Sequence, residues 1–77
     1  MPTVFTYKGH RFFFFSKEDN EPVHIHIEKD DKYAKFWIHP IELAKNIKFK
    51  SHELHQISII IKQHKKQIEE KWNEYFS

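Results

Sequence analysis

The sequence predicts an α+β domain in which a four-stranded antiparallel meander sheet packs on a long C-terminal helix, in the order ββββα or ββββαα. Two observations predict this fold class. The first half of the chain contains runs of β-branched and aromatic residues that alternate in polarity and are separated by turn signals. The C-terminal part repeats its apolar residues at helical spacing and has neither Gly nor Pro after Pro40.

The length and composition favour one small domain spanning residues 1–77. The chain has 77 residues, of which 39% are hydrophobic and 17% aromatic, and disordered chains lack such aromatic content. The absence of Cys excludes disulfides and thiolate chemistry. There is no run of 18 apolar residues and no N-terminal signal segment, so we expect a cytoplasmic protein that does not bind membranes. The formal charge of +2 does not by itself indicate nucleic-acid binding.

The first two strands are expected at residues 3–7 and 10–16, on either side of a tight turn at Lys8 and Gly9. Gly9 supplies the positive φ that such a hairpin needs. Within the second strand the four consecutive Phe residues, 12–15, must alternate between the two faces of the sheet. Only one pair can face the helix, so a loop or a second subunit must cover the other pair.

The next hairpin is predicted from residues 23–28 and 33–39, with its turn at Asp30 and Asp31. The apolar residues of both strands then coincide on one face, where Ile25 meets Phe36. The polar and aromatic residues coincide on the other face. We expect that face to be accessible to solvent, and its cross-strand pairs are His24 with Trp37, His26 with Lys35, and Glu28 with Tyr33.

The C-terminal part predicts one helix over residues 52–75, capped by Ser51. Residues 40–46 are interpreted as one or two helical turns that begin at Pro40, or as an irregular connector. A helix of this length measures about 35 Å, whereas short strands span about 17–20 Å. The helix should therefore extend beyond the sheet, and its aromatic end needs a partner or must fold back. Together with the two-sided Phe strand, this predicts a homo-oligomer or a protein partner.

The chain also resembles a known family. The strings "NEPVHIHIE", "AKFWIHPIELAKN" and "KWNEYFS" resemble a small bacterial family catalogued only as domain-of-unknown-function family four-one-six-zero. Its most specific parts, P-x-H-x-H and A-K-F-W, fall here on residues 22–26 and 34–37. In the family, two prolines usually precede the first histidine of the P-x-H-x-H string, whereas only Pro22 stands at that place in this chain. Members often have a small neighbouring gene, which implies a two-protein module of the toxin–antitoxin kind.

Three kinds of site are compatible with the polar face. A divalent metal could be held by His24 and His26, which project from one strand, with His39 or Glu28 as a third ligand. Alternatively, the same histidines with Lys35 offer the general acids and bases of a metal-free ribonuclease. Finally, the face could bind a protein or unpaired RNA bases through its interleaved aromatic and cationic residues.

We interpret the protein as a small binding module of a two-protein, toxin–antitoxin-like system that needs no cofactor. The runner-up hypotheses are a metal-free ribonuclease-like toxin and a metal-binding protein. The partner would be a protein or a second copy, with RNA as an alternative ligand. The residues predicted for the binding face are Tyr33, Lys35, Trp37, His24, His26, Glu28 and His39.

Overall fold

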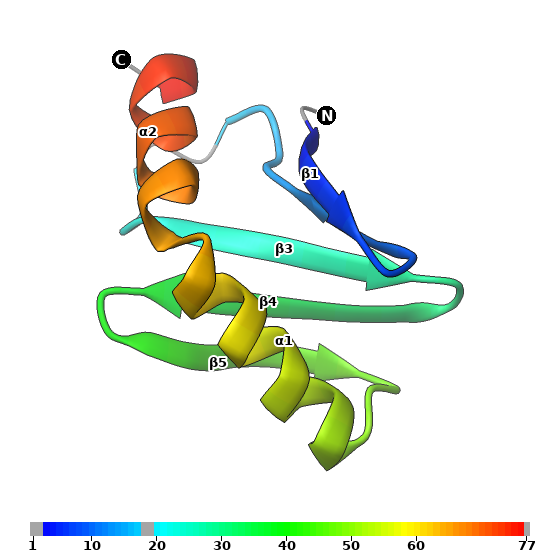
Figure 1. The fold of residues 1–77 in the computed structure, drawn as a ribbon. Helices are drawn as coiled ribbons and strands as arrows, with labels where there is room; N and C mark the ends of the chain where they lie inside the picture. The colour runs from blue at the N-terminus through cyan, green and yellow to red at the C-terminus, as the bar shows by residue number, and fades with distance from the viewer. Residues whose placement is uncertain (1–2, 18–19, 77) are drawn as a thin grey trace.

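A computed structural model describes residues 3–17 and 20–76 as a five-stranded antiparallel sheet followed by two helices. The strands follow one another across the sheet in chain order, and the helices cover one face and one end of it (Figure 1). Neither helix within these residues is long and apolar enough to cross a membrane. The α+β class is confirmed, with one strand more than predicted. The elements are β1 (Thr3–Tyr7), β2 (His10–Phe13), β3 (His24–Lys29), β4 (Lys32–Ile38), β5 (Ile41–Ile47), α1 (Ser51–Gln63) and α2 (Lys65–Phe76).

The β3–β4 hairpin has the predicted register. Ile25 lies opposite Phe36, His24 opposite Trp37 and His26 opposite Lys35. Its two-residue turn consists of Asp30 and Asp31. The alternating pattern of both strands therefore sorts the apolar set to one face and the histidines to the other, as expected for a pleat of period two.

The prediction of helical turns or an irregular connector at residues 40–46 is wrong, because residues 41–47 form β5. This strand pairs along its length with β4 and lies at the edge of the sheet. The pairing is interrupted where the register shifts between Lys35 and Phe36, which leaves Ala44 as an extra residue, a β-bulge. Pro40 stands in the turn before the strand rather than at the start of a helix.

The prediction of one continuous helix over residues 52–75 is also wrong. The helical region begins at Ser51, and the capping residue is Lys50, whose backbone N–H donates to Glu53 Oε1 at 2.9 Å. It is divided at His64, where the ring Nδ1 hydrogen-bonds to the Ile60 carbonyl at 2.9 Å. The His64 ring also stacks on Phe5 with 4.5 Å between centroids, so this histidine is packed against β1. The division lets α2 run in a different direction from α1 (Figure 1).

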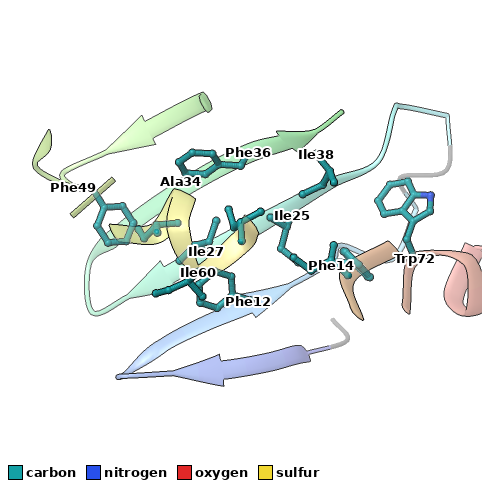
Figure 2. Packing of buried hydrophobic residues seen from close by; sticks show 13 residues of the cluster. Phe12, Phe14, Ile25, Ile27, Ala34, Phe36, Ile38, Phe49, Ile60 and Trp72 are labelled. Atoms are coloured by element: carbon teal, nitrogen blue, oxygen red, sulfur yellow. The ribbon is translucent and has the colours of Figure 1, made fainter. Parts of the chain in front are cut away.

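The main core lies between the helices and one face of the sheet. Its centre is formed by the inward side chains of β2, β3 and β4 (Figure 2). Trp72 of α2 reaches this core edge-on to Phe14, with 5.3 Å between ring centroids. Trp72 is thus covered by its own chain without an oligomer, whereas Tyr75 at the same end is 45% exposed. The buried apolar residues of this core are Phe12, Phe14, Ile25, Ile27, Ala34, Phe36, Ile38, Phe49, Ile57, Ile60, Ile61, Ile68 and Trp72.

Truncation of the core side of the hairpin should destabilise the fold. Ile25 is fully buried and Phe36 nearly so. Ile25→Ala or Phe36→Ala should lower the free energy of unfolding by about 2–5 kcal/mol, because each leaves a cavity. Denaturant titration followed by tryptophan fluorescence measures the change. Ile59→Ala, at a position 43% exposed on α1, is the matched control and should cost less than about 1 kcal/mol. Equal losses at Ile25 and Ile59 would contradict this core.

A charged pair links the hairpin to α1. Lys32 Nζ donates to Glu53 Oε2 at 2.8 Å, across the space between the start of β4 and the first helical turn. This hydrogen bond, aided by the N–H of Lys50, lowers the pKa of Glu53 from 4.5 to about 2. A carboxylate with a lowered pKa in the folded state stabilises the fold above its unfolded pKa, and it loses that effect as the pH falls toward the folded pKa.

We therefore expect an acid-dependent loss of stability that depends on Glu53. The free energy of unfolding should fall between pH 4.5 and about 2, and Glu53→Gln should remove this component of the fall. Lys32→Met should reduce it as well, because it removes the larger cause of the lowered pKa. Urea titrations at a series of pH values test both variants. A Glu53→Gln protein with the same pH dependence as the wild type would contradict the assignment.

Candidate functional site

The face of the sheet opposite the helices carries a second, smaller set of packed side chains. Phe13 of β2 lies opposite His26 of β3, so this phenylalanine belongs with the histidines rather than with the main core. Phe15, just after β2, contacts the His26 ring at 4.2 Å between centroids. We call this set the histidine face, and its members are Phe13, Phe15, His24, His26, Tyr33, Lys35 and Trp37.

The two histidines are buried, not solvent-accessible as predicted. The exposed fraction of His24 is 0% and that of His26 is 2%. Their rings lie 5.0 Å apart, nearly perpendicular to each other. The prediction failed because alternation separates the two faces of a strand but does not tell whether both are covered. Here Phe13, Phe15 and the aromatic rings of β4 cover the second face.

His24 is held from three sides. Its Nδ1 lies 2.8 Å from the carbonyl oxygen of Pro22, and because a carbonyl can only accept, this nitrogen carries the proton. Its Nε2 is 3.8 Å from Glu21 Oε1. The ring is packed edge-on against Trp37 of β4 and Trp72 of α2, with centroids 5.5 and 5.1 Å away. The Pro22 carbonyl thus fixes the tautomer, while the two indoles fix the position of the ring.

His26 is held by a phenol and two phenyl rings. Its Nδ1 makes a 2.6 Å hydrogen bond with the hydroxyl of Tyr33, which projects from β4 on the same face. The Tyr33 and His26 rings are stacked with 5.8 Å between centroids. Phe13 and Phe15 complete the surroundings at 5.5 and 4.2 Å. This part-buried hydrogen bond favours one arrangement of the two rings, and removing either partner should be costly.

A partly exposed layer lies over the buried histidines. Lys35 Nζ is 4.5 Å from the centre of the Trp37 ring, a cation–π contact, and it donates to Glu21 Oε1 at 2.9 Å. The same face continues onto β5, where Lys45 lies opposite Lys35 and Ile47 opposite Tyr33. Ile47 is 42% exposed. The accessible surface of the site therefore combines aromatic, aliphatic and cationic groups with the carboxylate of Glu21.

Two predicted members of the binding face lie apart from this layer. Glu28 pairs with Arg11 of β2 at 2.9 Å, and the Arg11 guanidinium lies over the Phe13 ring at 4.4 Å. His39 follows β4 and pairs with Glu69 of α2 at 2.7 Å. Glu28 thus borders the histidine face, whereas His39 joins the end of the sheet to the helix.

The metal hypothesis gains no support from this geometry. His24 and His26 are neighbours, but His39 pairs with Glu69 on α2. Within residues 3–17 and 20–76, no three side chains of His, Cys, Asp or Glu are grouped so that they could hold a metal ion. A structural metal would need about four such ligands.

Among the contributors to the site that sequence reasoning missed are Glu21, Lys45 and Ile47. Glu21 joins Lys35 to the surroundings of His24, and its signal was its place just before the P-x-H-x-H string. Lys45 and Ile47 were missed because β5 was taken for helical turns or a connector. The alternation of Ile41 and Leu43, broken at Ala44, was the available signal for this strand.

Comparison with known proteins agrees with the resemblance drawn from the sequence. The family model described as domain of unknown function DUF4160 matches residues 9–73. The chain belongs to this family. The DUF4160 match includes β2 to β5, all of α1 and most of α2, so it covers every residue of the histidine face. Searches of the curated proteins and of the solved structures find no match.

The burial of the DUF4160 histidines leads to a stability prediction. His24→Ala or His26→Ala should lower the free energy of unfolding by about 1–3 kcal/mol, since each removes a buried ring and strands its hydrogen-bond partner. His55→Ala, at an exposed position of α1, is the control and should stay within about 0.5 kcal/mol of wild type. Denaturant titrations of the wild type and the three variants measure these free energies of unfolding. Histidine-face variants that unfold like His55→Ala would show that these rings are not packed as described.

Proposed function

We propose that this DUF4160 protein is a small protein-binding module, one component of a two-protein system of the toxin–antitoxin kind. The observation that carries the proposal is the accessible layer over the buried histidines, formed by Tyr33, Lys35 and Trp37 of β4 with Lys45 and Ile47 of β5. The small neighbouring gene implied by the family resemblance is consistent with a dedicated protein partner.

The buried layer gives the accessible layer a fixed shape. Trp37 packs edge-on against the buried His24 ring, and the Lys35 ammonium lies over the Trp37 ring. Tyr33 is held by its hydrogen bond to His26. Aromatic side chains held in one position lose little conformational entropy on binding, which is why they often anchor protein interfaces. In this proposal the histidines position the binding residues and do not themselves contact the partner.

The charges of the layer favour a protein over RNA. Lys35 is paired with Glu21, and Glu42 lies opposite Trp37 on the same face. A phosphate backbone is attracted by unopposed cations, and these carboxylates would repel it. An exposed isoleucine such as Ile47 adds nothing to the recognition of phosphate, but it suits the apolar centre of a protein interface.

The other hypotheses have less support in the geometry. A ribonuclease requires a general base and a general acid that reach the 2′-hydroxyl and the leaving oxygen. His24 and His26 are 0% and 2% exposed, so neither ring contacts a substrate in this arrangement. Metal binding would require His39 to leave Glu69 and join the other two histidines.

The binding proposal is tested by substituting two isoleucines that are almost equally exposed but lie on different surfaces. Ile47 on β5 is 42% exposed and Ile59 on α1 is 43% exposed. Ile47→Lys places a charge in the proposed interface and should weaken partner binding by about tenfold or more, since burying an unpaired charge costs at least about 1.4 kcal/mol. Ile59→Lys should bind like the wild type.

The measurement starts with quantitative co-purification of the tagged wild-type protein and both variants from the native host. The protein that is lost with Ile47→Lys and retained with Ile59→Lys is then purified, and its affinity for each variant is measured by calorimetry. A partner lost with Ile59→Lys but not with Ile47→Lys would place the interface on α1. Recovery of RNA in place of a protein, with binding lost on Lys45→Glu, would overturn the proposal in favour of the RNA ligand.

A further inference from the structure

β5 leaves one edge of the sheet without a neighbouring strand among the described residues 3–17 and 20–76. Six of its seven residues are exposed, including Leu43 at 40%. Strand β1 forms the other edge of the sheet. An exposed edge strand presents unpaired N–H and C=O groups, and these favour pairing with another chain.

The direction of these backbone groups follows from one hydrogen bond. The Ile38 N–H donates to the Val23 carbonyl at 3.2 Å, so the polar groups of Ile38 point toward β3. Because this direction alternates along an antiparallel strand, the groups of Trp37 and Lys35 point toward β5. Their partners on β5, Glu42 and Lys45, therefore point back into the sheet. The outward-directed groups belong to Ile41, Leu43 and Asn46.

The bulge at Ala44 determines which side chains of β5 share a face. In a regular strand, residues three positions apart project to opposite faces. The extra residue reverses the alternation, so Glu42 and Lys45 both lie on the histidine face, opposite Trp37 and Lys35 respectively. β5 thus carries one negative and one positive side chain on the same face, on either side of its centre.

We propose that two copies of this protein pair antiparallel along β5 and form one continuous ten-stranded sheet, twice the five strands of one copy. In this pairing Glu42 of each copy lies opposite Lys45 of the other copy, on the histidine face. Ile41 of each copy lies opposite Asn46 of the other, and both are residues whose backbone groups point outward. The interface is therefore isologous, as expected for a two-fold dimer.

Charge favours this register over the two registers in which Glu42 or Lys45 lies opposite its own copy. A register that places Glu42 opposite its own copy brings two carboxylates together, and one that places Lys45 opposite its own copy brings two ammonium groups together. Like charges directly across an antiparallel pair are destabilising, whereas opposite charges stabilise the pair. The register with Glu42 opposite Lys45 forms two such opposite-charge contacts by symmetry, and it also directs the outward backbone groups of Ile41 and Asn46 at each other.

A charge-exchange experiment tests both the dimer and its register. Sedimentation velocity of the purified full chain over a concentration series gives the dissociation constant of the dimer. Glu42→Lys and Lys45→Glu should each raise it by about tenfold, because each replaces two attractive contacts by two repulsive ones. The double variant Glu42→Lys, Lys45→Glu re-forms both contacts with exchanged signs and should return to within about threefold of the wild type. Denaturant titration of each variant confirms that the monomer fold is retained.

Amide hydrogen exchange gives an independent readout of the same pairing. The N–H groups of Ile41 and Asn46 point to solvent in one copy, so their exchange should slow as the protein concentration rises. The exchange of Glu42 and Lys45, already directed at β4, should not depend on concentration. A wild-type protein that stays monomeric over the whole series would overturn the proposal. A dimer whose dissociation constant is unchanged by both single variants would also overturn it. A double variant that dimerises as weakly as the single variants would overturn the register.

This inference does not depend on the proposed partner site, because it is measured with the purified protein alone. Failure of the dimer would leave the comparison of Ile47→Lys with Ile59→Lys unaffected. Conversely, failure to find a partner protein would end the binding proposal, and the purified protein could still form the dimer along β5. The two results are therefore distinguishable.

Discussion

The register of the β3–β4 hairpin is the constraint on which the rest of the structure depends. Each strand contributes one residue set to the main core and the other to the histidine face, where His24 and His26 of β3 are buried as well. A slip by one residue would exchange Ile25 and Ile27 with His24 and His26, and it would break both layers at once. β2 follows the same rule, since Phe12 and Phe13 lie opposite Ile27 and His26. The three central strands are thus held in one alignment from both sides.

The parts of the fold that could be predicted are those governed by local alternation. In β3 and β4 the apolar and polar sets are distinct and regular, so the pairing followed directly from the sequence. β5 could not be recognised in the same way. Its Glu, Leu, Ala and Lys residues favour helices, and the bulge at Ala44 interrupts the alternation that marks a strand. Its conformation is set by pairing with β4, which is a tertiary effect.

For the histidine face, the sequence predicted which side chains are neighbours but not that the two histidines are buried. Alternation placed His24 and His26 beside Trp37, Lys35 and Tyr33, and the structure brings these side chains together. Whether a face is covered depends on segments distant in sequence. Coverage of His24 requires Trp72, and that in turn requires the division of the helical region at His64, which neither Gly nor Pro marks.

The position of Trp72 makes the two layers of side chains energetically interdependent. Its indole contacts Phe14 in the main core and His24 on the other face, around the end of the sheet. A small domain with two separate packed layers could in principle lose one while keeping the other. Because a single side chain near the C-terminus belongs to both, loosening either layer withdraws support from the other, and the fold should melt in one cooperative step.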